Sequence, residues 1–155
     1  MSFSTCTASR SENNFISISS EEHRSKTFVS ACEKGLFLER IVTEISNKLG
    51  IPANVKGYRY LRSAVVMAAD DPELAESITK KLYPAVAAQY CATPARVERN
   101  IRHAICCAWE KHSGDTHAAE ELLHCPISYS DDPPTNSELI ALISDSIRLS
   151  YSAGQ

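Results

Sequence analysis

The sequence predicts an all-α protein, and three observations support this fold class. There are only 5 glycines in 155 residues, and aromatic side chains make up 7%, which disfavours a sheet protein with many tight turns. Apolar residues recur at the 3.6-residue spacing of amphipathic helices along most of the chain after Gly35. Capping residues and prolines divide that pattern, whereas no segment shows the alternation typical of a strand. We therefore expect about six or seven helices.

The first 35 residues differ from the rest in composition. Ser, Thr and Asn dominate residues 1–20, apolar residues are few there, and disorder is expected. Acidic residues follow Ser20, and the sequence up to Gly35 is compatible with a short helix. We thus expect an N-terminal extension over 1–35 and one helical domain over 36–152. No segment has the apolar run of a signal peptide or a membrane span, so we expect a soluble, cytoplasmic protein without a membrane partner.

Two helices are predicted ahead of Asp71. In the first, apolar residues recur at helical spacing, and Gly50 with Pro52 ends the helix. Its apolar positions are Leu36, Phe37, Ile41, Ile45 and Leu49. The second covers residues 57–70, and its apolar stripe comprises Tyr58, Leu61, Val65, Ala68 and Ala69.

The next segment is predicted to form a helix with a strong start signal. Asp71 can cap its N-terminus, and Pro72 suits the first helical position. This helix is expected to run through Leu82, and Pro84 to mark a break. A short helix that ends near Tyr90 should follow.

The clearest helix start lies at Thr93, a good N-cap, with Pro94 at the first helical position. The helix should continue to about Lys111. At 100° per residue, one face of it is apolar: Val97, Ile101, Ala104, Ile105 and Ala108. The other face carries Arg96, Arg99, Arg102 and His103, with Glu98 at the border.

Two more helices are predicted towards the C-terminus. A short one is expected over 116–123, followed by an irregular stretch. Thr135 and Glu138 have the spacing of a capping box, which should open the last helix. The buried face of that helix should comprise Leu139, Ile140, Ile143 and Ile147.

The formal net charge of −3 conceals an uneven distribution. From Ser77 to His112 six basic residues face two acids, so this segment is +4 and the remainder −7. One basic segment on an acidic body is compatible with binding a polyanion through one face. A short helix, the four-residue turn CATP and a helix with polar first turns together suggest a helix-turn-helix. Clustered arginines repel one another, which favours an anionic partner such as DNA.

Other interpretations of these residues compete with DNA binding. The six cysteines are expected to be reduced thiols that mostly pack as small apolar groups, because no secretion signal is present. A metal site is not expected, since the candidate ligands lack the paired spacing of zinc sites: His103, Cys106, His112, His117, His124 and Cys125. Cys106 and Cys107 lie in mid-helix without an evident acid or oxyanion donor, so neither an enzyme nor a cofactor is implied. The main alternative is a helical protein-interaction module that uses the arginine face for an acidic partner.

Four separated stretches resemble, in the same order, the C-terminal effector domain of stage-zero sporulation protein A, the sporulation response regulator of endospore-forming Firmicutes. They are GYRYLRSAV, SITKKLYPAVA, TPARVERNIRHAI followed by Trp109, and PTNSELIA. The resemblance covers roughly residues 37–151. Ala95, where the family has a serine-like residue, and the stretch from Cys106 to Pro133 depart from the family pattern. The 35 residues ahead are too few for the receiver domain that normally precedes this effector.

The resemblance implies a compact six-helix domain with a helix-turn-helix that binds double-stranded DNA at a TGTCGAA-like box and regulates transcription. It implies base readout by Arg96, Glu98 and Arg99 in the major groove. It further implies phosphate contacts by Arg102, His103, Lys80 and Lys81, and RNA polymerase sigma factor as a partner near the 106–133 stretch. Because one small DNA-binding module buries only about 600–1,000 Å², self-association on tandem sites is also expected.

Overall fold

The computed structural model describes residues 30–112, 114–129 and 132–153, and within them every regular element is helical, which confirms the all-α prediction. A helix over residues 30–48 is followed by α2 (Lys56–Asp70), α3 (Pro72–Glu76), the π-helix η1 (Ile78–Leu82), α4 (Tyr83–Gln89), α5 (Pro94–Lys111), α6 (Thr116–Leu123) and α7 (Asn136–Ala153). The described residues fall into two units, the first of which ends at Phe37 and the second of which begins at Leu38. The disorder expected over 1–20 lies outside the described residues.

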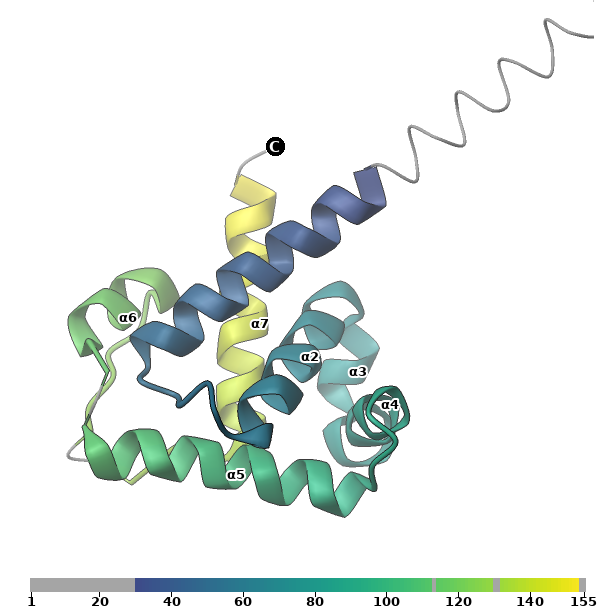
Figure 1. Cartoon of the computed structure of the whole chain (residues 1–155). Coiled ribbons are helices and arrows are strands. Elements are labelled where there is room, and N and C mark those ends of the chain that lie inside the picture. Colours follow the sequence, from purple (N-terminus) through teal and green to yellow (C-terminus); the bar gives the residue numbers. More distant parts are fainter. Residues whose placement is uncertain (1–29, 113, 130–131, 154–155) are drawn as a thin grey trace, which may run out of the picture. The chain divides into compact units, whose positions relative to one another are not determined.

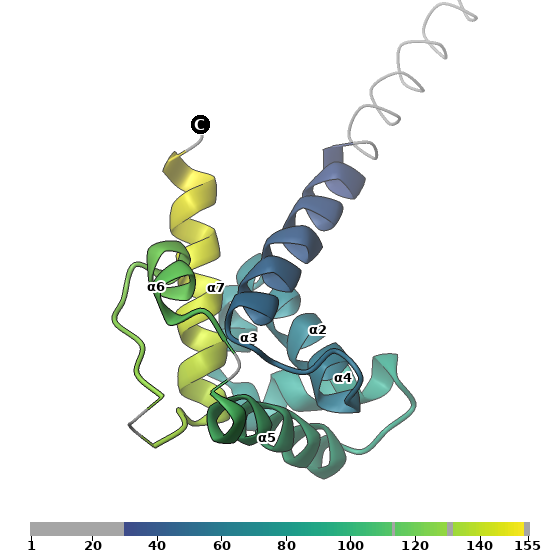
Figure 2. The same ribbon diagram turned by 60° about the vertical axis from the view of Figure 1, so that its left-hand side comes forward.

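The core of the second unit is aliphatic, as its composition predicts. α2 packs against both α5 and α7. In Figures 1 and 2, α5 runs across one end of the unit and α7 rises away from it. The large side chains that are fully buried are Val42, Ile45, Leu49, Leu61, Val65, Leu82, Ile101, Ile105, Leu139, Ile140, Ile143 and Ile147. None of the helices in the described ranges has both the length and the apolarity to cross a membrane.

The helix over 30–48 differs from its prediction in two ways. Gly35 lies inside it and does not separate two helices. The buried side consists of Leu38, Val42, Ile45 and Leu49, whereas Leu36 and Phe37 are exposed. Both stripes have helical spacing, so periodicity alone could not choose between them.

The segment between α2 and the helix-turn-helix breaks earlier than predicted. The Asp71 carboxylate accepts from the Glu73 amide at 3.0 Å, so the expected cap is confirmed. The break falls at Ser77, whose φ of −129° and ψ of 55° are not helical. Pro84 causes none: it lies in the first turn of α4, and the π-helical turn of η1 runs directly into it.

The second predicted helix of the helix-turn-helix is confirmed as α5, from Pro94 to Lys111. Thr93 Oγ1 accepts from the Arg96 amide at 3.3 Å, and His112 ends the helix with a φ of 48°. In the preceding turn Cys91 has a φ of 50°, a left-handed conformation unusual for a residue with a side chain.

The C-terminal predictions are also confirmed. α6 covers the expected residues. The Thr135 amide donates to the Glu138 carboxylate at 2.8 Å, and the Glu138 amide donates to Thr135 Oγ1 at 3.2 Å, which is the predicted capping box. The predicted packing of the cysteines is found only in part among the described residues. Cys32 and Cys91 are exposed, whereas Cys106, Cys107 and Cys125 are half-buried, and Cys125 packs against the core.

Candidate nucleic-acid interface

α5 presents one apolar and one basic face, as its sequence predicts. All five predicted core residues of the helix are fully buried, and Trp109 is buried with them. On the outer face Arg96, Glu98, Arg99 and His103 are exposed, and Arg102 is half-buried. In the view of Figure 1 the outer edge of α5 has no other helix beyond it. The polar side chains at this edge are therefore accessible to a large partner.

Contacts from α2 fix the turn that leads into α5. The Tyr90 hydroxyl lies 2.7 Å from Ser63 Oγ, and it donates to the Arg59 carbonyl at 3.4 Å. The Tyr90 ring meets Tyr60 edge to face, with 5.1 Å between centroids, and the Arg59 guanidinium lies 5.6 Å from its centroid. Since α4 ends next to Tyr90, these contacts hold the two helices of the helix-turn-helix in a fixed relation to α2.

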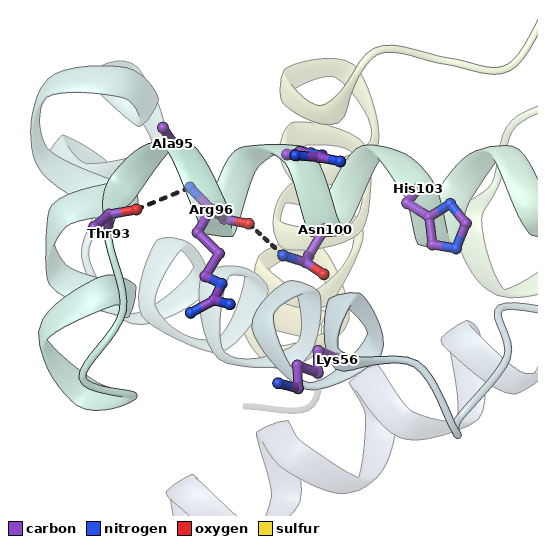
Figure 3. A pocket seen from close by; sticks show the side chains of 7 residues that line it. Lys56, Thr93, Ala95, Arg96, Asn100 and His103 are labelled. Atoms are coloured by element: carbon purple, nitrogen blue, oxygen red, sulfur yellow. Dashed lines mark hydrogen bonds between the residues drawn. The ribbon is translucent and has the colours of Figure 1, made fainter.

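A hollow of about 720 Å³ lies along one side of α5, and we call it the basic hollow. Its lining comprises Lys56, Thr93, Ala95, Arg96, Arg99, Asn100 and His103. Figure 3 shows Lys56, from the first turn of α2, on the same side of α5 as Arg96, Asn100 and His103. The residues that line it include three permanent cations and no carboxylate. Such a concentration of one charge favours an anionic partner.

The cations of the basic hollow have no counterion within the part of the chain that the structure describes. Among the described residues, the side chains of Lys56, Arg96 and Arg99 make no ion pair and no hydrogen bond. The Asn100 amide donates instead to the Arg96 carbonyl at 2.6 Å, within α5. Three like charges held near one another without a partner destabilise the free protein slightly, and an arriving polyanion would relieve that repulsion.

A second hollow of about 410 Å³ lies on the other side of α5, and we call it the mixed hollow. Its lining comprises Thr79, Tyr83, Ala95, Glu98, Arg99, Arg102, Thr135, Asn136 and Ser137. Arg99 lines both hollows, so it lies between them on the outermost line of α5, which we call the crest of the helix. The lining of the mixed hollow includes the Glu98 carboxylate beside two arginines. It combines side chains of α5 with side chains from the first turn of α7.

Polar groups of the mixed hollow hold α5 in place. Asn136 Nδ2 donates to the Glu98 carbonyl at 2.9 Å and to the Tyr83 hydroxyl at 3.2 Å, so one buried amide connects α4, α5 and α7. Burial raises the pKa of Tyr83, which keeps the phenol protonated. Arg102 Nη1 donates to the Pro134 carbonyl at 2.6 Å and to that of Pro133 at 3.5 Å. Arg102 therefore anchors the loop before α7.

Lys80 and Lys81, which were also predicted to contact phosphates, line neither the basic nor the mixed hollow. Both belong to η1. Lys81 Nζ pairs with the Glu73 carboxylate at 3.1 Å, with both side chains exposed. The structure thus groups Arg96, Glu98, Arg99, Arg102 and His103 along α5 and leaves these lysines on a neighbouring element.

His103 has a thiol neighbour one turn along α5. Cys107 Sγ lies 3.6 Å from His103 Nε2 on the partly exposed side of the helix. Over the described ranges, no three histidine, cysteine or acidic side chains are grouped closely enough to hold a metal ion.

Sequence reasoning missed three residues that shape this surface. Lys56 and Asn100 line the basic hollow, and Asn136 joins α7 to α5. Helical spacing places Asn100 beside Arg96 and could have indicated it. Lys56 and Asn136 are brought to α5 only by tertiary packing, so no local signal could place them there.

The comparison with protein families agrees with the geometry. Residues 42–147 match the family model described as the sporulation initiation factor Spo0A C terminal. The match spans more than two thirds of the chain and includes every residue of both hollows.

Proposed function

The chain belongs to the Spo0A C-terminal family, whose members are DNA-binding transcription effectors and not enzymes, and from this premise we propose that α5 reads a specific DNA sequence. The site is the outer face of α5, which enters the major groove of a TGTCGAA-like box. The observation that carries the proposal is the position of Arg96 and Arg99. Both are exposed on the second helix of a helix-turn-helix, and neither has a counterion among the described residues.

The base readers are Arg96, Glu98 and Arg99. An arginine can donate two hydrogen bonds to O6 and N7 of guanine, and a glutamate can accept from N4 of cytosine. These side chains lie in the first turns of α5, the part of a recognition helix that reaches the base edges in helix-turn-helix proteins. Such a set suits a box with guanine and cytosine at its centre.

The phosphate contacts are Arg102 and His103, with Lys80 and Lys81 at the edge of the interface. One guanidinium nitrogen of Arg102 donates a hydrogen bond to the loop before α7, and an arginine has five N–H donors in all. The loop therefore orients the guanidinium while other donors remain for a phosphate. His103 lines the basic hollow and is exposed. Lys81 would exchange its exposed ion pair with Glu73 for a phosphate at little cost.

Transcriptional regulation follows from such binding, and two further partners belong to the proposal. One copy of α5 contacts a single box, so self-association on tandem boxes would raise the affinity through effective concentration. RNA polymerase sigma factor is the proposed partner of the 106–133 stretch. The first 35 residues form, in this proposal, an extension ahead of the DNA-binding domain over 36–152, and the helix over residues 30–48 spans this boundary.

The test is a fluorescence-anisotropy titration of the chain with a TGTCGAA duplex and with a scrambled duplex of the same composition, at several salt concentrations. We expect tighter binding to the box, together with a steep loss of affinity as salt rises, because binding to phosphates releases counterions. Equal affinity for both duplexes would contradict sequence-specific binding. Binding to an acidic protein but to neither duplex would instead favour the protein-interaction module.

A further inference from the structure

The basic hollow contains one cation that lies outside the helix-turn-helix. Lys56 is the first residue of α2, and it lines the hollow together with Arg96, Arg99 and His103 of α5. We propose that Lys56 is a phosphate-binding residue that clamps one DNA backbone against this side of α5. This inference rests on the proposed function and adds to it a contact from a third helix.

Gly57 brings the first turn of α2 against α5. A Cβ at this position would lie 1.9 Å from the Asn100 carbonyl oxygen and 2.8 Å from Ala104 Cβ, so only glycine allows the two helices to approach this closely. The backbone of α2 therefore lies directly on α5 next to Lys56. Figure 3 shows the resulting arrangement, in which the Lys56 side chain faces the same hollow as Arg96.

Within residues 30–112, 114–129 and 132–153, Lys56 has no stabilising partner. No acidic residue occupies the first turn of α2, and Val55 supplies no side-chain cap. A cation at the N-terminus of a helix is opposed by the helix dipole. Among the described residues, Lys56 has no ion pair, and its nearest charged neighbours in the hollow are cations. The exposed ammonium is thus unfavourably placed in the free chain and well placed for a polyanion.

The geometry also indicates which of the two DNA backbones Lys56 contacts. Arg99 stands on the crest of α5, with the basic hollow on one side and the mixed hollow on the other. When a helix lies in the major groove, the two phosphate backbones that border the groove lie on its two sides. Lys56 therefore contacts the backbone on the basic side, and that contact carries no base preference.

The test compares Lys56→Gln and Lys56→Ala with Lys111→Gln, which removes the same charge from an exposed residue of α5 outside both hollows. Binding of the box and of the scrambled duplex is measured at salt concentrations from about 50 to about 200 mM. We expect both Lys56 variants to bind the two duplexes about equally more weakly. Their salt slopes should fall by about 0.9, so that the deficit shrinks about 3.5-fold across this salt range. Lys56→Arg should bind as the natural chain does.

A second measurement locates the contact on the DNA. Single phosphates of the box are replaced by neutral methylphosphonates along both strands. We expect one or two adjacent positions on a single strand to weaken the natural chain and to have no effect on Lys56→Gln. An unchanged salt slope in Lys56→Gln, or the same phosphate profile as the natural chain, would overturn the assignment of Lys56. Failure of the natural chain to prefer the box would instead overturn the proposed function.

Discussion

The two sides of α5 differ in what their polar side chains already contact. On the basic side Lys56, Arg96 and Arg99 have no partner among the described residues. On the mixed side Asn136 and Arg102 bind carbonyl groups of α5 and of the loop before α7. The contacts of the mixed side hold the fold, whereas the cations of the basic side are unpaired among the described residues. Residues of both sides belong to the proposed interface, but only those of the mixed side also stabilise the fold.

The largest effect is expected where α2 meets the basic side of α5. Gly57→Ala places a methyl group against the Asn100 carbonyl, and backbone atoms cannot move away as a flexible side chain could. We expect a loss of about 3 kcal/mol in the free energy of unfolding, measured in urea. Gly35→Ala is the matched control, because a Cβ at that position would meet nothing within 4 Å. It should stabilise its helix by about 0.5–1 kcal/mol. Equal effects of the two substitutions would contradict the close approach of α2 to α5.

The second largest effect is expected on the mixed side of α5, from the loss of Asn136. Asn136→Ala removes the hydrogen bonds to the Glu98 carbonyl and to the Tyr83 hydroxyl, so we expect a loss of about 2 kcal/mol in unfolding free energy. Ser137→Ala, at an exposed neighbouring position, should change stability by less than about 0.5 kcal/mol. If Asn136→Ala unfolds at the same urea concentration as the natural chain, Asn136 does not hold α5.

Arg102 and Arg99 lie on the same helix, but only Arg102 is bonded to another part of the protein among the described residues. Arg102→Ala removes the bond to Pro134 and should cost about 1 kcal/mol of stability as well as affinity for every duplex. Arg99→Ala should leave stability within about 0.5 kcal/mol. Thermal unfolding measures the stability of both variants, and anisotropy measures their affinity for DNA on the same samples. A stable Arg102→Ala protein with normal affinity would remove Arg102 from both roles.

The smallest effect is a pH dependence at the start of α7. The bonds from the Thr135 amide and hydroxyl, and to a lesser degree the nearby charge of Arg102, hold the pKa of Glu138 below its ordinary value of 4.5. A lowered carboxyl pKa stabilises the folded state above the ordinary pKa, and this contribution disappears as pH falls through the lowered value. The natural chain should therefore exceed Glu138→Gln in stability at neutral pH, and the difference should vanish well below pH 4.5. A difference that persists in strong acid would contradict the capping role.

Local signals in the sequence were sufficient for most of the helices. The caps at Asp71, Thr93 and Thr135 form as predicted, because each depends on residues only two or three positions apart. The register of the first helix and the break at Ser77 were missed. Two apolar stripes compete in the first case, and in the second a π-helix continues into α4 without a break at Pro84.

The candidate site was predicted only in part. Periodicity separated the core face of α5 from the face with Arg96, Arg99 and His103, because one helix carries both. The contributions of Lys56 and Asn136 depend on packing between helices distant in sequence, and no spacing rule reports that. For the same reason the sequence could not show that Arg102 is bound to the loop before α7.

The most direct test of the account is the specificity ratio of Arg99→Ala. The ratio of affinities for the TGTCGAA duplex and its scrambled form is measured by anisotropy at one salt concentration, for the natural chain and for the variant. We predict that the natural chain prefers the box and that Arg99→Ala loses about 1–3 kcal/mol of this preference, with little change in its affinity for the scrambled duplex. An equal loss of affinity on both duplexes would show that Arg99 contacts only phosphates, and it would contradict base readout from the crest of α5.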